Sequence, residues 1–149
     1  MIPPRLILVP IDFEEVSDHA LEHAIGLASA LKATVHITHI LQLPVYNFPD
    51  ASFLASPELI ARLSTSAQTR MNAVLAKLQN SGVTIESSLR EGVPHEEVIA
   101  AAKAMNADLI VMGTHGRGLI AHALLGSVAE RVVRTSPVPV LVVRKSESK

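Results

Sequence analysis

Residues 107–116 read ADLIVMGTHG, and residues 126–135, after a spacer, read GSVAERVVRT. The first segment is a short apolar run that predicts a buried strand ending in glycines, and the second has the apolar spacing of a helix. Glycines let the backbone approach a ligand closely and take up positive φ, while the free amides at a helix start favour an anion. This strand, glycine loop and helix therefore predict an α/β fold with a phosphate-binding loop.

Strand-like and helix-like segments alternate along the rest of the chain. Residues 6–11 and 34–41 predict buried strands, residues 83–89 a more alternating strand, and residues 137–143 a strand with two prolines at its start. Helices are expected between them: one capped by Ser17, one that starts at Ser56 and Pro57 with Leu59 on its buried side, one after Gly92, and one over residues 127–135.

This alternation indicates right-handed βαβ units in a single domain over residues 1–149. We predict a doubly wound, mainly parallel sheet of five strands, flavodoxin-like or Rossmann-like, with strand order 3-2-1-4-5 and helices on both faces. Ligands of such sheets bind outside the carboxyl ends of the strands, where the strand order reverses. If strands 1 and 4 are neighbours, Asp12 faces the loop that starts at Gly113.

Composition excludes several classes of function. The formal net charge of −1 and the 3% of aromatic residues argue against a nucleic-acid-binding protein. The chain has no cysteine, which rules out disulfides and thiolate metal sites and is compatible with a reducing cytoplasm. Its apolar runs are interrupted well before the ~20 residues that a membrane-spanning helix needs. We therefore expect a cytoplasmic protein without a membrane partner.

The glycine loop differs from two well-known phosphate motifs. No Gly-Lys-Ser/Thr follows the spacer, as a P-loop requires, and Gly113, Gly116 and Gly118 give GxxGxG after strand 4 instead of GxGxxG after strand 1. Taken alone, the loop is also consistent with a turn whose glycines are structural. Asp12 likewise has two interpretations, a ligand contact or a polar cap for the turn that follows strand 1.

The wider pattern resembles the nucleotide-binding branch of the universal stress protein family. The resemblance rests on residues 9–12 (VPID), on Gly113-x2-Gly116-x9-Gly126-Ser127, and on residues 126–134 and 137–143, and it extends over essentially the whole chain. It implies an ATP-binding stress-response protein, a homodimer through the last strand (Val138 to Val143), and Mg²⁺ or Mn²⁺ bound through the phosphates. The nucleotide-binding residues that it implies are Pro10, Ile11, Asp12, Ile40, Met112, Gly113, His115, Gly116, Gly126, Ser127 and Val128.

Few features of the sequence indicate catalysis. The predicted pocket has no Walker lysine and no paired metal carboxylates, and no Gly-x-Ser-x-Gly elbow surrounds Ser127. We assign no catalytic residue, and slow ATP hydrolysis and a protein-interaction module stay open as alternatives. Arg117 could add a cation or be a solvated loop residue.

The histidines outside the loop give no metal-binding motif. His19 and His23 are four apart without a third ligand, and a solvated helix face explains them better than zinc. His36 and His39 are three apart on a strand, so they face opposite sides of the sheet and are expected to be structural.

Overall fold

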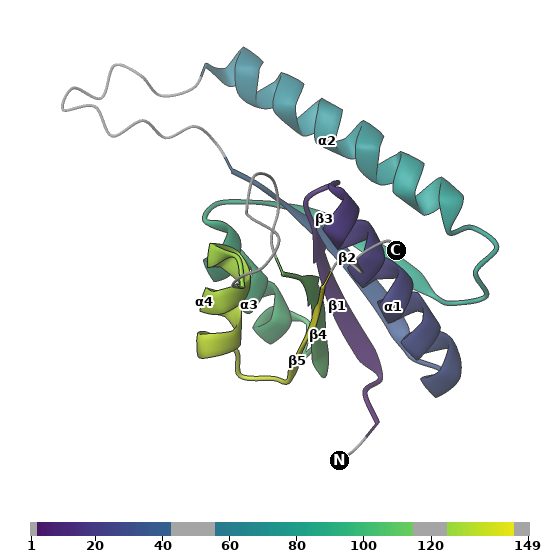
Figure 1. The fold of residues 1–149 in the computed structure, drawn as a ribbon. Coiled ribbons are helices and arrows are strands. Elements are labelled where there is room, and N and C mark those ends of the chain that lie inside the picture. Colours follow the sequence, from purple (N-terminus) through teal and green to yellow (C-terminus); the bar gives the residue numbers. More distant parts are fainter. Residues whose placement is uncertain (1–2, 43–55, 115–124, 145–149) are drawn as a thin grey trace, which may run out of the picture.

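A computed structural model of the chain describes residues 3–42, 56–114 and 125–144. Its strands form one sheet in the order β3-β2-β1-β4-β5, and every neighbouring pair is parallel. This confirms the predicted doubly wound α/β fold and strand order (Figure 1). The elements are β1 (Leu6–Ile11), α1 (Glu15–Leu31), β2 (Thr34–Leu41), α2 (Pro57–Lys77), β3 (Ile85–Glu91), α3 (Pro94–Ala104), β4 (Leu109–Gly113), α4 (Ser127–Thr135) and β5 (Val140–Val143).

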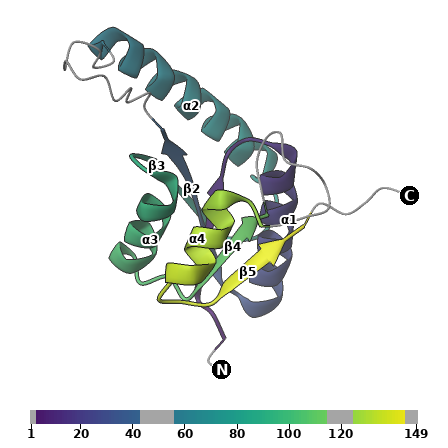
Figure 2. The same ribbon diagram turned by 60° about the vertical axis from the view of Figure 1, so that its left-hand side comes forward.

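The central strand β1 sends its side chains into two separate cores. Ile7 and Val9 belong to the core on the side of α1 and α2, whereas Leu8 belongs to the core on the side of α3 and α4. All three side chains are fully buried, as the period-two alternation of a strand covered on both faces requires. Figures 1 and 2 show α1 and α2 over one face of the sheet and α3 and α4 over the other.

Helix α1 meets the sheet through small side chains. Ala20, Ala24 and Ala28 recur every four residues and are buried against the strands. Residues at this spacing lie on one face of a helix, and alanine lets that face come close to its neighbours. The first turn of α1 is thereby held near the carboxyl end of β4.

Two predictions about the helices are wrong. Ser17 does not cap α1, because the helix begins at Glu15 with Glu14 at the N-cap, and Ser17 lies buried within the first turn. Leu59 is 41% exposed, although its spacing placed it on the buried side of α2. The N-terminal half of α2, to which Leu59 belongs, projects past the described strands in both ribbon views (Figures 1 and 2).

The strand boundaries differ slightly from those that the sequence predicts. Strands β3 and β4 begin two residues later than expected, at Ile85 and Leu109, and β5 begins at Val140, after both prolines. Proline has no N–H to donate to a sheet, so the regular pairing of β5 starts beyond Pro139. Within the described segments, no helix is both long and apolar enough to cross a bilayer.

Candidate functional site

A cavity of about 510 Å³ opens at the carboxyl ends of β1, β2 and β4. The chain order reverses there, because β2 and β3 lie on one side of β1 while β4 and β5 lie on the other. Every predicted site residue that the structure describes lines this cavity: Pro10, Ile11, Asp12, Ile40, Met112, Gly113, Gly126, Ser127 and Val128. The other two, His115 and Gly116, lie outside the described residues, as does Arg117.

The Asp12 carboxylate organises the turn between β1 and α1. Its Oδ1 accepts hydrogen bonds from the Glu14 amide at 2.9 Å and from the Ser17 hydroxyl at 2.9 Å. This is the turn-capping role that the sequence left open. Asp12 is exposed and lines the cavity, and no described residue is hydrogen-bonded to its Oδ2. The carboxylate is therefore held in place through one oxygen and can present the other to the cavity.

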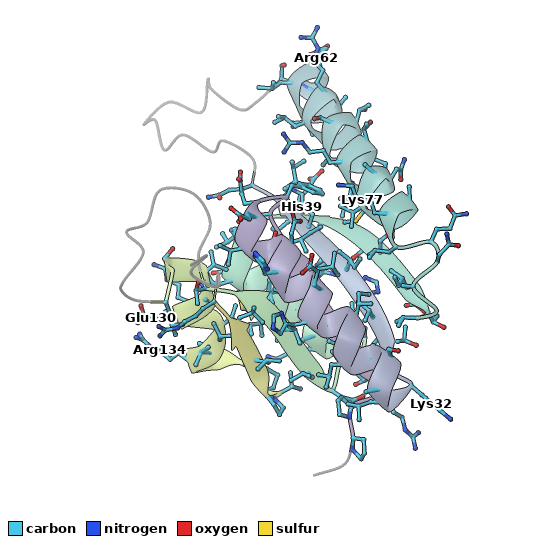
Figure 3. The ribbon with its side chains drawn as sticks, turned by 45° about the vertical axis from the view of Figure 1, so that its right-hand side comes forward. Lys32, His39, Arg62, Lys77, Glu130 and Arg134 are labelled. Atoms are coloured by element: carbon cyan, nitrogen blue, oxygen red, sulfur yellow. The ribbon has the colours of Figure 1, made fainter. Side chains whose placement is uncertain are left out.

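His39 is a lining residue that the sequence analysis assigned to structure alone. Its Nδ1 is 2.8 Å from the Ile11 carbonyl oxygen, which can only accept, so Nδ1 donates this bond. The ring centroid lies 4.5 Å from that of Phe13, whose φ of 64° turns the chain sharply after Asp12. Figure 3 shows His39 at the end of β2, between the start of α1 and α2. The hydrogen bond from His39 to Ile11 holds the carboxyl ends of β1 and β2 together beside the cavity.

Gly113 is required by packing. A Cβ atom at this position would lie 2.6 Å from Val16 Cγ1 and 3.1 Å from the Val16 carbonyl oxygen. Neither Gly113 nor Gly126 has a positive φ, so the left-handed conformation expected of the loop glycines is not found at these two positions. The close approach of α1 therefore explains why a glycine ends β4, with or without a ligand in the cavity.

Thr114 joins the two ends of the glycine loop. Its amide donates to the Val143 carbonyl oxygen at 3.1 Å, and its carbonyl oxygen accepts from the Gly126 amide. The residue is buried. These two bonds bring the start of α4 to the end of β4, although ten residues between them lie outside the described chain. The Gly126 amide, already bonded, is not available to a ligand in this arrangement.

The start of α4 contributes backbone hydrogen-bond donors to the cavity. Gly126 occupies the N-cap with φ −60° and ψ 163°, and glycine has no side chain with which to cap the first-turn amides. Ser127, Val128 and Ala129, the next residues, all line the cavity. Among the described lining residues the titratable side chains are Asp12 and His39. A helix start of this kind binds anions through its amides and dipole.

Several lining residues were not predicted: Ser17, His39, Leu41, Gln42, Pro94, Val98, Thr114 and Ala129. Leu41 and Gln42 extend the β2 wall beyond Ile40, and Pro94 and Val98 come from the first turns of α3. Ser17 could have been predicted from the sequence, because a polar residue five positions after Asp12 can reach back to it. Pro94 and Val98 could not, because the position of α3 over the sheet depends on tertiary packing.

The chain matches the model of the universal stress protein family over residues 4–144. It belongs to that family. It is 38% identical over 143 residues to the universal stress protein MJ0531 of Methanocaldococcus jannaschii, a match that covers 95% of this chain and 82% of the relative. The family resemblance that the sequence motifs indicated is therefore confirmed.

Solved universal stress protein structures agree with the fold. Protein MJ0577 of M. jannaschii superposes with a TM-score of 0.82 at 31% identity, over 99% of this chain and 100% of that one. A universal stress protein solved in complex with cAMP superposes with a TM-score of 0.63 at 26% identity, over 97% and 99% of the two chains. At least one relative of similar fold thus holds an adenine nucleotide.

Proposed function

We propose that this universal stress protein binds ATP in the cavity at the carboxyl ends of β1 and β4 and acts as a nucleotide-dependent regulatory protein of the stress response. The observation that carries the proposal is the convergence on one cavity of every predicted nucleotide-binding residue that the structure describes. The cAMP complex of a relative supports an adenine nucleotide as the ligand.

Each wall of the cavity suits one part of the nucleotide. Pro10, Ile11 and Ile40 offer backbone and apolar surface for the adenine, and Asp12 offers a carboxylate oxygen for the ribose hydroxyls. The phosphates would meet the first-turn amides of α4 and the Ser127 hydroxyl. His115 and Gly116 are proposed to complete the phosphate end, as the family resemblance implies.

Calorimetric titration with ATP, combined with a phosphate-release assay, tests this proposal. Stoichiometric binding without appreciable release supports the regulatory function. Binding with sustained phosphate release would favour a weak ATPase instead. If the protein has no measurable affinity for ATP or ADP, the protein-interaction module becomes the favoured function. The packing role of Gly113 supports that alternative, because it explains this glycine without a ligand.

We propose that the ATP carries Mg²⁺ or Mn²⁺ on its phosphates. Among the described lining residues there is no lysine or arginine, and the Asp12 carboxylate is anionic when ionised, so the charge of a triphosphate lacks a protein counter-ion there. Removing Mg²⁺ with EDTA is expected to weaken ATP binding by about tenfold, or about 1.4 kcal/mol. AMP carries less charge, and its affinity should change little. Equal losses for both nucleotides, measured by calorimetry, would contradict metal-assisted binding.

We also propose a homodimer through β5, the outer strand of the sheet. Leu141 in this strand is 41% exposed, and an apolar edge strand needs cover. Light scattering at micromolar concentration is expected to give the mass of a dimer, and Leu141→Arg should shift it to a monomer. Leu59→Arg is the control, because Leu59 is equally exposed on α2, far from β5 (Figure 2). A monomeric wild-type protein would refute the proposal.

A further inference from the structure

Three side chains on β2 and β3 form a hydrogen-bonded series outside the cavity. His36 Nδ1 is 3.4 Å from Glu86 Oε2, and His36 Nε2 is 2.8 Å from Ser88 Oγ. None of the three is among the residues that line the cavity. A carboxylate, an imidazole and a hydroxyl joined in this order are the parts of an activated serine nucleophile.

The proton positions follow from the chemistry of the three groups. An ionised Glu86 carboxylate can only accept, so the His36 proton lies on Nδ1. Nε2 of the neutral ring can then only accept, and the Ser88 hydroxyl, which also donates to Thr38 Oγ1 at 3.1 Å, must rotate its single proton toward Nε2 to donate to it. The histidine is thus held in the tautomer that can remove the Ser88 proton. Protonation of the ring would reverse this bond, because both nitrogens would then donate.

The sheet itself fixes the arrangement. His36 pairs with Glu86 and Thr38 pairs with Ser88 in the parallel register of β2 and β3, which places all four side chains on one face. Thr38 is fully buried, and its Oγ1 accepts from Ser88 Oγ at 3.1 Å and donates to the Ser88 carbonyl oxygen at 3.4 Å, which positions the serine from its other side. Groups held by neighbouring strands need little reorganisation before they react.

The three groups differ in their access to solvent. The Glu86 side chain is 60% exposed and that of His36 is 13% exposed, while Ser88 is partly buried. Another charged pair on this side of the sheet, Arg90 of β3 with Glu97 of α3, is joined at 3.3 Å. Arg90 therefore has its own carboxylate partner, and Glu86 remains with His36. Ser88 lies on an outer strand of the sheet and keeps part of its surface exposed to solvent, which a small reagent needs in order to reach it.

We propose that Ser88 is a nucleophilic serine that accepts acyl groups from small activated acyl donors, with His36 as its general base and Glu86 as a positioning residue. Ser88 Oγ attacks the acyl carbonyl carbon, its proton passes to His36 Nε2, and the alcohol, phenol or thiol leaving group departs with that proton. Water then hydrolyses the ester with His36 again as base. A general base raises the rate of such a step by about 10²–10⁴-fold, so we expect reaction with activated donors such as aryl esters and thioesters.

The test is acetylation of the full-length protein by p-nitrophenyl acetate, located by peptide mass spectrometry. Ser87 is an internal control, because it neighbours Ser88 on β3 but faces the opposite side of the sheet. Ser88 is expected to acetylate at least about tenfold faster than Ser87. Ser88→Ala should abolish this reaction, and Ser87→Ala should leave its rate unchanged.

Two further variants separate catalysis from structure. His36→Gln keeps a polar side chain without a base, and we expect it to slow Ser88 acetylation by about 100-fold. Glu86→Gln should change the pH dependence of that rate, which a purely structural Glu86 would not do. An unchanged rate in a folded His36→Gln protein would overturn the proposal. So would equal acetylation of Ser87 and Ser88 in the wild-type chain, a comparison that needs no variant.

Discussion

Replacing Gly113 with alanine is expected to lower the free energy of unfolding by about 1–3 kcal/mol, the range in which overpacking of a closely packed site falls. The new methyl carbon would lie 2.6 Å from Val16 Cγ1 and about as close to the Val16 backbone as a real contact allows, with 3.1 Å to its carbonyl oxygen. The Val16 side chain or the whole of helix α1 must shift to relieve this contact. Chemical denaturation of both proteins measures the loss.

Gly26→Ala is the matched control for this substitution. Gly26 lies within α1, and an added Cβ would meet nothing within 4 Å. Alanine in a helix interior is favoured over glycine by about 1 kcal/mol, so this variant should be more stable than the wild type. If Gly113→Ala is as stable as the wild type, the contact with Val16 does not determine the residue at this position.

Shortening Val16 should restore only part of the lost stability. In Val16→Ala/Gly113→Ala the side-chain clash disappears, but the carbonyl oxygen and carbonyl carbon of Val16 would still lie 3.1 and 3.2 Å from the new Cβ. The double variant is therefore expected to be less destabilised than the sum of the single variants predicts, by about 0.5–1 kcal/mol. Strict additivity would indicate that the backbone alone excludes a side chain.

The role of Gly113 shows what a glycine motif can and cannot predict. The sequence placed this residue correctly, at the end of β4 and beside the cavity, because strand and loop signals are local. It predicted close approach of a phosphate and left a structural role of the glycine open, and the structure shows close approach of α1. Both causes need a missing side chain, and only the position of Val16, which depends on tertiary packing, distinguishes them.

The same distinction applies to the rest of the cavity. Asp12 and Ile40 follow or end their own strands, so the strand order alone brings them to one edge of the sheet. Pro94 and Val98 reach the cavity only because α3 packs over β2, and no local pattern encodes that placement. Ser88 and His36 lie about fifty residues apart in the chain, and only the register of β2 and β3 brings them together.

Gly126→Val is expected to weaken ATP binding by at least about 30-fold, or about 2 kcal/mol. Gly126 has an extended backbone that valine adopts readily, and its amide bond to Thr114 can persist, so the fold should survive. The substitution adds an isopropyl group to a residue that lines the cavity, next to Ser127 and Val128, whose amides are proposed to bind the phosphates. Calorimetry on the folded variant gives the affinity directly.

The substitution also removes a favourable N-cap residue, and this second effect needs its own control. Ser56→Ala changes the N-cap of α2, where the Ser56 hydroxyl accepts from the Leu59 amide at 3.1 Å, and should cost about 1 kcal/mol of stability. Ser56 does not line the cavity, so its variant should bind ATP as the wild type does. Loss of affinity in Gly126→Val alone locates the phosphates at α4. If both variants bind ATP as tightly as the wild type, the phosphates lie elsewhere, because a branched side chain and a triphosphate cannot occupy the same helix start.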